Sequence, residues 1–280
     1  MRILGDLEIG VMFWAGRDPG ETLREVMSLG ARCGQLGVPP ELDLASSAKA
    51  WHEALEHADF PLQTVFCAYE GESYTDIPTV ERTVGFVPKA SRKAREQRTL
   101  DASDFAEKLG VGSIATHIGC LPEDSWGEDY LVVRGMVRRI CDHAAKRRQT
   151  FALETGQESA ERLLAFLHDV NRENLGINFD PANMILYGTG DPIEALGVLG
   201  QHVISVHAKD GDWPPRDHSG ALGQEKPLGQ GAVGIEGFVK KLKRIGYRGQ
   251  LNVEREASDP VQRLADIRAG VALLEKLRDA

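Results

Sequence analysis

Eight short runs of apolar and β-branched residues alternate with amphipathic helical segments along the whole sequence. The predicted strands cover residues 9–13, 33–36, 62–68, 113–116, 150–154, 175–180, 203–207 and 250–254. Neighbouring parallel strands must be joined by a crossover, so strict alternation of strand and helix predicts a parallel sheet. Eight such units favour closure into a single (β/α)8 barrel, an α/β fold that commonly needs about 250 residues.

The segments between the strands carry signals that begin and end helices. Asp18 is a suitable N-cap for a helix that ends near Gly30, and Pro260 lies in the first turn of the last helix. The predicted helices cover residues 19–29, 48–57, 98–109, 130–148, 159–170, 192–199, 235–245 and 259–277. Since no linker or internal repeat divides the sequence, we expect one barrel domain over residues 1–280.

An open, doubly wound sheet is the alternative fold for the same order of elements. Its dinucleotide-binding form would place a G-x-G-x-x-G turn after the first strand. Gly10 and Gly16 do not form that motif. The closed barrel therefore remains the predicted fold.

Two connections are too long for simple barrel turns. One covers about residues 69–97 and carries a basic cluster at Lys89, Arg92, Lys93 and Arg95. The other covers about residues 209–234 and is rich in glycine and proline. Long loops in a compact domain commonly act as lids or binding loops, although a solvated surface excursion is the alternative. We expect both loops to lie over the C-terminal face of the barrel.

The composition excludes some classes of partner and compartment. The net charge of −9 argues against nucleic acid or an anionic membrane, because both need a cationic protein face. The four cysteines form no C-x-x-C pair, which predicts reduced, inert thiols in a cytoplasmic protein. We find no signal peptide, and no apolar run approaches the roughly 20 residues that span a bilayer.

Four of the predicted strands end on a side chain that can bind a metal ion: Glu154, Asp180, His207 and Glu254. Because the C-terminal ends of parallel strands meet at one rim of a barrel, we expect these groups to converge. Three carboxylates in an apolar setting would repel one another and be costly to desolvate, and a bound cation removes that cost. The sequence therefore predicts a site for one divalent metal ion.

The predicted ligands also indicate the kind of metal. Three carboxylates and one imidazole make a hard, mostly oxygen site, which favours Mn²⁺ and also suits Mg²⁺ or Co²⁺, with Zn²⁺ as a further candidate. Each ligand has a structural alternative: Glu154 as a helix-terminal carboxylate, Asp180 before Pro181 as a turn pair, His207 as a structural histidine, and Glu254 as a partner of Arg255 or Lys209. Four such residues in register favour metal binding.

The segments around these ligands resemble a known family. They are LETG at residues 153–156, NFDPAN at 178–183, VHAKD at 206–210, PLGQG at 227–231 and VERE at 253–256. These segments are similar to the xylose isomerase-like TIM-barrel superfamily of sugar and sugar-phosphate isomerases and epimerases. The resemblance covers essentially the whole chain, is strongest over residues 150–256, and implies a TIM barrel with a small-molecule carbohydrate substrate.

For mechanism, the resemblance implies a metal-dependent isomerase that works through an enediolate. In the ketose 3-epimerases of this group, two metal-binding glutamates flank the reacting carbon, and Glu154 and Glu254 match their positions. One carboxylate would remove the proton and the other would return it on the opposite face, as an acid/base pair. The metal would orient a carbonyl and an adjacent hydroxyl and would stabilise the enediolate.

Six further residues are candidates for substrate binding: His117, Glu158, Asn183, Lys209, Trp14 and Arg216. His117 follows the fourth predicted strand, and the ring of Trp14 could stack on a sugar. Lys209 could neutralise an anionic substrate group or pair with Asp210. A purely structural role remains open for His117, Glu158 and Trp14.

The sequence departs from the family pattern at two places. Asn183 lies where ketose epimerases and endonuclease IV usually carry histidine, so the known ketose substrates are less well supported. Asp217 and His218 are adjacent instead of forming an Asp-x-His pair. Together with the acidic net charge, these differences argue against a DNA-repair enzyme.

Two other functions fit the same ligands. A lyase or dehydratase on a keto-sugar or keto-inositol would use the same metal and enediolate but would expel a β-substituent. A non-catalytic sugar-binding barrel would bind carbohydrate without proton transfer, and the four intact ligands make it the least favoured. The resemblance also allows a homo-oligomer, which no residue specifies.

Overall fold

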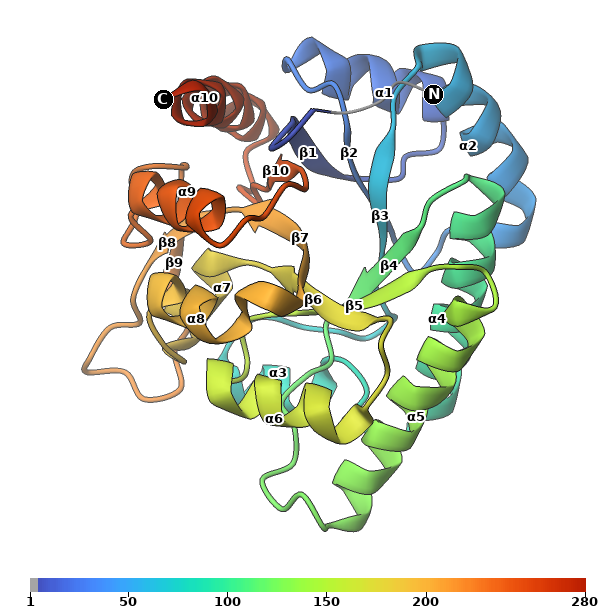
Figure 1. The fold of residues 1–280 in the computed structure, drawn as a ribbon, viewed down its shortest axis with the longest axis vertical. Helices are drawn as coiled ribbons and strands as arrows, with labels where there is room; N and C mark the ends of the chain where they lie inside the picture. The colour runs from blue at the N-terminus through green and yellow to red at the C-terminus, as the bar shows by residue number, and fades with distance from the viewer. Residues whose placement is uncertain (1–4) are drawn as a thin grey trace.

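A closed barrel of parallel strands forms the centre of the computed structural model, which describes residues 5–280 (Figure 1). Around the barrel the strands follow the order β1-β10-β7-β6-β5-β4-β3-β2. Their bounds are β1 Ile9–Trp14, β2 Gly34–Val38, β3 Leu62–Cys67, β4 Ser113–Thr116, β5 Thr150–Glu154, β6 Leu175–Phe179, β7 Val203–Ala208 and β10 Leu251–Val253. The predicted barrel is confirmed, each strand end lies within about two residues of its predicted place, and the open sheet is excluded.

The register of the strands brings their C-terminal ends to one rim. Glu154 at the end of β5 pairs with Asn178 of β6, and His207 of β7 pairs with Asn252 of β10. Side chains two residues apart on a strand point to the same face. The strand-end positions of β5, β6, β7 and β10 therefore face the same space above the barrel interior.

Side chains of each strand alternate between the barrel interior and the surrounding helices. The interior holds a small apolar group, Met12, Phe66, Ala115 and Ala152 with Ile204 packed against it, together with buried polar side chains such as Gln35 and Asn178. The larger core lies between the strands and the helices and includes Val11 and Phe13 of β1. This two-layer arrangement leaves the C-terminal rim as the place where polar side chains can gather.

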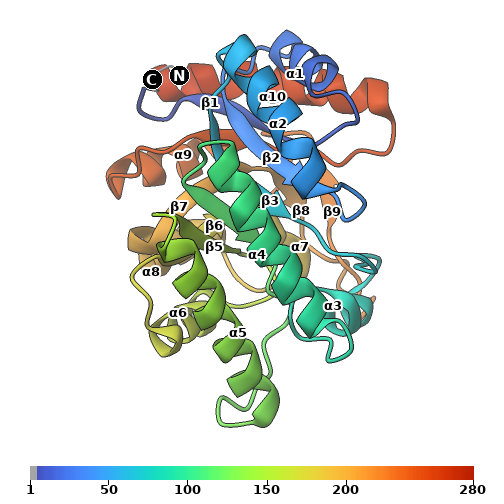
Figure 2. The same cartoon turned by 90° about the vertical axis from the view of Figure 1, so that its right-hand side faces the viewer.

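The helices form a layer around the outside of the barrel (Figures 1 and 2). Their bounds are α1 Pro19–Ser28, α2 Leu44–Ala58, α3 Ile77–Thr83, α4 Arg92–Lys108, α5 Glu128–Ala145, α6 Ala160–Val170, α7 Pro181–Tyr187, α8 Pro192–Leu199, α9 Ile235–Arg244 and α10 Pro260–Asp279. The predicted cap of α1 is confirmed, because the side chain of Asp18 accepts the backbone N–H of Glu21. All eight predicted helices are present, and their ends differ most at α2 and α4.

The starts of α2 and α4 were predicted too late along the chain. α2 begins at Leu44 instead of residue 48, because the side chain of Asp43 caps it. α4 begins at Arg92 instead of residue 98. Arg92 and Arg95, predicted as parts of a loop cluster, lie in its first turns and donate hydrogen bonds to the backbone carbonyls of residues 85–87.

The two long loops contain secondary structure that the sequence did not predict. The loop at residues 69–97 includes α3, and the loop at residues 209–234 includes an antiparallel pair, β8 Asp210–Asp212 and β9 Gln224–Lys226. α7 follows Asp180 directly and was also not predicted. The amide of Ile77 donates a 2.9 Å hydrogen bond to the carbonyl of Gly220, so the two loops contact each other.

Two further predictions concern membrane-spanning helices and the cysteines, and both can be compared with the described residues. Among them, no helix combines the length and the apolar character needed to cross a bilayer. None of the four cysteines forms a disulfide among the described residues, and Cys33, Cys67 and Cys141 are buried. Burial raises the pKa of the Cys67 and Cys141 thiols to about 12, which keeps them in the unreactive protonated form.

Candidate metal centre and substrate cavity

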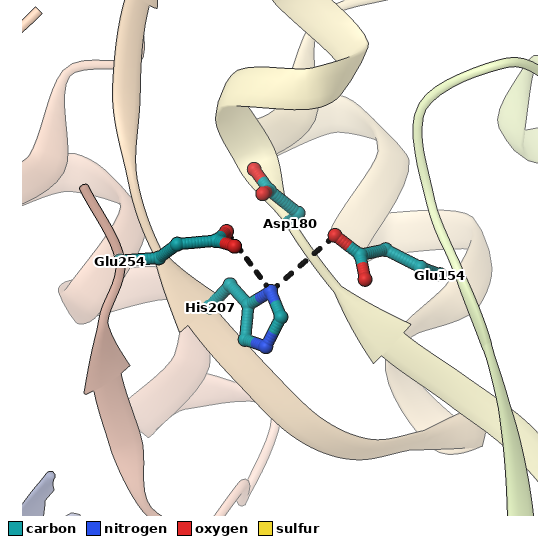
Figure 3. A group of neighbouring side chains, drawn as sticks. All are labelled: Glu154, Asp180, His207 and Glu254. Carbon is teal, nitrogen blue, oxygen red and sulfur yellow. Dashed lines mark ion pairs between the residues drawn. The ribbon is translucent and has the colours of Figure 1, made fainter. Parts of the chain in front are cut away.

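Four neighbouring strands deliver the four predicted ligands to one point. Glu154 ends β5, Asp180 follows β6, His207 lies in β7, and Glu254 follows β10. One ligand atom from each residue lies within 4.8 Å of all the others. Figure 3 shows the four side chains turned toward one another. The group could hold a metal ion, as the spacing along the sequence predicts.

His207 occupies the middle of this group. Its Nδ1 lies 3.3 Å from Oε1 of Glu154 and 3.1 Å from Oε2 of Glu254, on either side of the ring (Figure 3). Glu154, Asp180 and His207 are buried, and Glu254 is nearly so. The two glutamates therefore approach the same small volume from opposite directions.

Three of the four ligands carry a buried polar atom without a hydrogen-bond partner. These atoms are Oδ2 of Asp180, Nδ1 of His207 and Oε2 of Glu254. Leaving a buried donor or acceptor unsatisfied costs about 1–3 kcal/mol, so such atoms are rare in folded proteins. A divalent cation bound among them would satisfy all three, and the residues present therefore fit this group.

The structural roles considered for these residues are partly present. Asp180 caps α7, because its Oδ1 accepts the amide of Asn183 at 2.9 Å, while its Oδ2 faces the site. Oε2 of Glu254 lies 3.3 Å from Nζ of Lys209. Glu154 does not cap the next helix, because the side chain of Ser159 does so. The cap formed by Asp180 and the contact between Glu254 and Lys209 therefore still leave carboxylate oxygens that could bind a metal ion.

Burial and charge act against each other in this cluster. Burial raises the pKa of Asp180 well above its usual range, although Lys209 opposes the shift. Burial would also raise the pKa of Glu254, but Lys209 and His207 outweigh it and hold that pKa below its usual range. Burial would lower the pKa of His207, and the carboxylates of Glu254 and Glu154 raise it instead. Three acids facing one imidazole and one ammonium leave the site short of positive charge.

A chain of buried amides sets the orientation of His207. Nε2 of His207 lies 3.0 Å from Oε1 of Gln35, and Nε2 of Gln35 donates to Oδ1 of Asn178 at 3.1 Å. Ser205 also donates to Oδ1 of Asn178, and Nδ2 of Asn178 donates to Oε2 of Glu154 at 3.3 Å. With its amide nitrogen used, Gln35 can only accept from His207. When the ring is neutral, as metal binding requires, the proton of His207 would therefore be held on Nε2 and the Nδ1 lone pair would face the site.

Sequence reasoning missed these orienting residues, although a signal exists. Asn178 lies two residues before Asp180, and Ser205 lies two residues before His207. In a strand, that spacing places both members of each pair on the same face. A polar residue two positions before a strand-end ligand, inside an otherwise apolar strand, could have identified both.

A cavity of about 270 Å³ lies beside the ligands. Of the predicted site residues, Trp14, His117, Asn183, Lys209 and Glu254 line it. The residues that sequence reasoning missed are Phe66, Ala68, Glu72, Tyr74, Leu186, Tyr187, Leu222, Gly223, Glu225 and Glu256. Several of these come from the two long loops, so both loops contribute walls to the cavity.

His117 and Lys209 are close to the catalytic candidates. Nε2 of His117 lies 3.9 Å from Oε2 of Glu154, and its ring packs against Phe66 and Tyr74. Nζ of Lys209 donates to Oε2 of Glu256 at 2.9 Å. The alternative pairing of Lys209 with Asp210 is wrong, because Asp210 accepts four backbone amides of the following loop instead.

Asn183 takes the place of the usual histidine and contacts a ligand directly. Its Nδ2 donates to Oε1 of Glu154 at 2.9 Å. Together with Asn178, it fixes both oxygens of that carboxylate. A neutral amide at this position can orient Glu154 without supplying a further charge or a metal-binding nitrogen.

Two predicted substrate-binding residues lie away from the cavity lining. Glu158 accepts the amide of Leu121 and forms a 2.6 Å ion pair with Arg162. Burial raises the pKa of Glu158 to about 7. Arg216 is exposed in the loop between β8 and β9, and the adjacent Asp217 and His218 contact each other there. The structure therefore gathers four of the six predicted substrate-binding residues around the ligands.

The family described as xylose isomerase-like TIM barrel matches residues 23–277. The chain belongs to this family. The resemblance inferred from the LETG, NFDPAN and VHAKD segments is thereby confirmed.

Individual members of the xylose isomerase-like family show how close the likeness is. A xylose isomerase domain protein from Planctomyces limnophilus is 43% identical, with a TM-score of 0.92 over 98% of both chains. A ketose 3-epimerase from Arthrobacter globiformis is 27% identical over 60% of this chain and 58% of its own length. The chain spans about two thirds or less of the curated relatives that it matches.

A solved sugar complex shares the fold. The D-allulose 3-epimerase from Methylomonas sp., in complex with D-allulose, has a TM-score of 0.71 and 20% identity over 100% of this chain and 99% of its own. At that identity the likeness extends to the barrel alone. The relatives of this chain thus include sugar epimerases, and the chain carries a candidate metal centre of its own.

Proposed function

We propose that this protein is a divalent-metal-dependent isomerase or epimerase of sugars or sugar phosphates. One observation carries the proposal: Glu154 and Glu254 approach Nδ1 of His207 from opposite sides, at 3.3 and 3.1 Å. A substrate carbon held in the cavity beside the metal position, between the two glutamates, would have a carboxylate on each face. One carboxylate would accept the proton from the carbon next to a carbonyl, and the other would return it.

The two glutamates have different hydrogen-bond partners, which suits one of them to accept the proton and the other to return it. Asn178 and Asn183 donate to both oxygens of Glu154, which fixes its position. Oε2 of Glu254 accepts no hydrogen bond and has only charged neighbours, Nζ of Lys209 at 3.3 Å and the ring of His207. A bound divalent cation, for which Mn²⁺ is our first candidate, would supply positive charge to stabilise an enediolate. The ammonium of Lys209 would then be placed to donate a hydrogen bond to a substrate oxygen.

Solvent-exchange measurements test the proposal. The purified protein would be analysed for bound metal and then incubated in D₂O with a panel of keto-sugars and keto-sugar phosphates. Proton NMR should show deuterium entering next to the carbonyl, with a new epimer or isomer and no loss of mass. Glu154→Gln and Glu254→Gln should each slow this exchange by about 10²–10⁴-fold. Glu161→Gln, an exposed change on α6, should leave the rate unaltered.

The same spectra separate the two other functions. Elimination of water or another β-substituent would identify a lyase or dehydratase on a keto-sugar or keto-inositol. Saturable binding without any deuterium incorporation, and unchanged by both glutamine variants, would identify a non-catalytic sugar-binding barrel. Either result would replace the isomerase proposal.

A further inference from the structure

A second hollow adjoins the substrate cavity along the rim of the barrel. It is a groove of about 520 Å³, and it shares Trp14, Glu254 and Glu256 with the lining of the 270 Å³ cavity. Ligand pockets for small molecules commonly measure about 300–1,000 Å³. The cavity beside the ligands is small on this scale, and the groove extends the space available next to it.

The groove runs along the whole of α1, from residues 16–18 before the helix to Leu29 after it, and faces the N-terminal half of α10; the two helices flank β1 (Figure 1). Since each barrel helix begins after a strand ends, the end of the groove at Asp18 and Arg263 lies toward the C-terminal rim, next to the cavity. Its floor is apolar and includes Val26, Leu29 and Ile267. Glu21 and Glu25 of α1 face the groove from one side, and Arg263 of α10 from the other.

Trp14 stands at the boundary between the groove and the cavity. Its side chain is 43% exposed, although it ends a strand of the barrel. The indole packs closely over Gly37 of β2, where an added Cβ would lie only 2.5 Å from Cε3 of Trp14. The glycine therefore leaves the space that the indole occupies. The result is a supported aromatic face open to both hollows.

We propose that the groove is a second sugar-binding subsite, so that the substrate is a carbohydrate of two joined units. This inference rests on the function proposed above. The keto-sugar unit would lie beside the metal ligands, and the second unit would lie in the groove against Trp14. Aromatic faces and apolar floors suit the C–H faces of a sugar ring, while carboxylates accept its hydroxyl groups.

The charge of the groove favours a neutral second unit. Five carboxylates line it, those of Asp18, Glu21, Glu25, Glu254 and Glu256, against three arginines, Arg17, Arg255 and Arg263, of which Arg255 is already paired with Glu225 and Asp266. A phosphate in the groove would meet these carboxylates. An uncharged sugar would instead find hydrogen-bond acceptors along the walls.

Binding and exchange measurements with defined sugars test the subsite. The probes are D-fructose and three disaccharides that contain it, lactulose, maltulose and isomaltulose, each with the metal-loaded protein. Isothermal titration should give at least one disaccharide a dissociation constant about tenfold or more below that of D-fructose. In D₂O, the same disaccharide should have the higher kcat/KM for deuterium incorporation.

Matched variants locate the second unit. Glu25→Phe places a bulky side chain on the α1 wall and should remove the preference for the disaccharide over D-fructose. Trp14→Ala should reduce that preference as well. Met27→Phe adds the same ring to an exposed position of α1 that does not line the groove, and should keep the wild-type preference.

The outcomes distinguish the subsite from the proposed function. If every disaccharide binds no more tightly than D-fructose, the subsite is wrong even if D-fructose exchanges its proton. If no sugar exchanges but a disaccharide binds more tightly and Glu25→Phe removes the difference, the subsite stands and the isomerase proposal fails. If sedimentation shows a wild-type dimer that Glu25→Phe converts to a monomer, the groove is an interface between copies and the subsite is overturned.

Discussion

The candidate metal ligands and the walls of the cavity beside them are built in different ways. Glu154 and His207 lie in barrel strands, so strand register and the alternation of side chains determine where they point. Tyr74 and Glu225 come from the two long loops, whose course depends on particular contacts such as the hydrogen bond between Ile77 and Gly220. Chemistry carried by strands can therefore be predicted from spacing, whereas the shape of the cavity cannot.

The largest expected effect is the loss of metal affinity when a candidate ligand at a strand end is changed. Asp180→Asn keeps an oxygen for capping α7 but removes a ligand charge, so metal affinity should fall by more than about 100-fold. The metal-free variant should be at least as stable as wild type, because a buried carboxylate no longer faces Glu154 and Glu254. Titration calorimetry and thermal unfolding with and without metal measure both effects.

Asp191→Asn is the matched control, because Asp191 caps α8 in the same way but is exposed and outside the site. It should leave metal affinity unchanged. If metal raised the melting temperature of Asp180→Asn as much as it raises that of wild type, Asp180 would not be a ligand.

The loop side of the comparison depends on Asp210. Its two carboxylate oxygens accept the amides of Gly211, Gly229, Gly231 and Val233. Asp210→Asn would turn an amide nitrogen toward these donors and should lower the free energy of unfolding by about 1.5–3 kcal/mol. Urea unfolding measures this loss, and limited proteolysis should show faster cleavage within residues 213–223.

The comparison predicts that this loop variant separates substrate binding from metal binding. Because the ligands lie on strands, Asp210→Asn should raise KM while leaving the metal dissociation constant near its wild-type value. Asp212→Asn, a half-exposed partner of Lys226, is the control and should change neither. An equal loss of metal affinity in Asp210→Asn would mean that the loops help to build the ligand cluster.

How far the sequence could predict the structure follows the same division. The eight strands and the convergence of all four candidate ligands could be predicted from periodicity, because alternate side chains of a barrel strand point inward and all the strands end at the same rim. Glu158 was expected at the site from its closeness to Glu154, but the helix that follows turns it toward Leu121 and Arg162. Tyr74 and Glu225 carry no periodic signal, since their positions depend on contacts between loops distant in sequence.

A smaller effect should follow from removing the buried amide that orients His207. Gln35→Leu deletes the acceptor for Nε2 of His207 and the donor to Asn178. Metal affinity should fall by about 10–100-fold, as for other groups that orient a ligand. Gln250→Leu makes the same change at a buried position before β10, away from the rim, and should not alter metal affinity. An unchanged affinity in Gln35→Leu would show that the ring is oriented by packing alone.

An effect on stability alone, outside the metal site, concerns Glu158, which lies near the site in sequence but faces a loop contact. Its pKa is about 7 in the folded protein because of burial, against 4.5 for an ordinary glutamate. At a pH between 4.5 and about 7, Glu158 has lost its proton in the unfolded chain but keeps it in the folded protein. The free energy of unfolding therefore decreases as pH rises through this window, by up to about 1.4 kcal/mol per pH unit.

Glu158→Gln removes this titration, so it isolates the contribution of a single side chain. The stability of wild type relative to the variant should be greatest near pH 4.5 and should fall as pH rises to about 7. Urea unfolding of both proteins across this range measures the difference. Glu161→Gln, an exposed neighbour on α6, should track wild type at every pH. A difference that grows with pH would instead mean that the ion pair with Arg162 outweighs burial, and that this loop contact is held by charge.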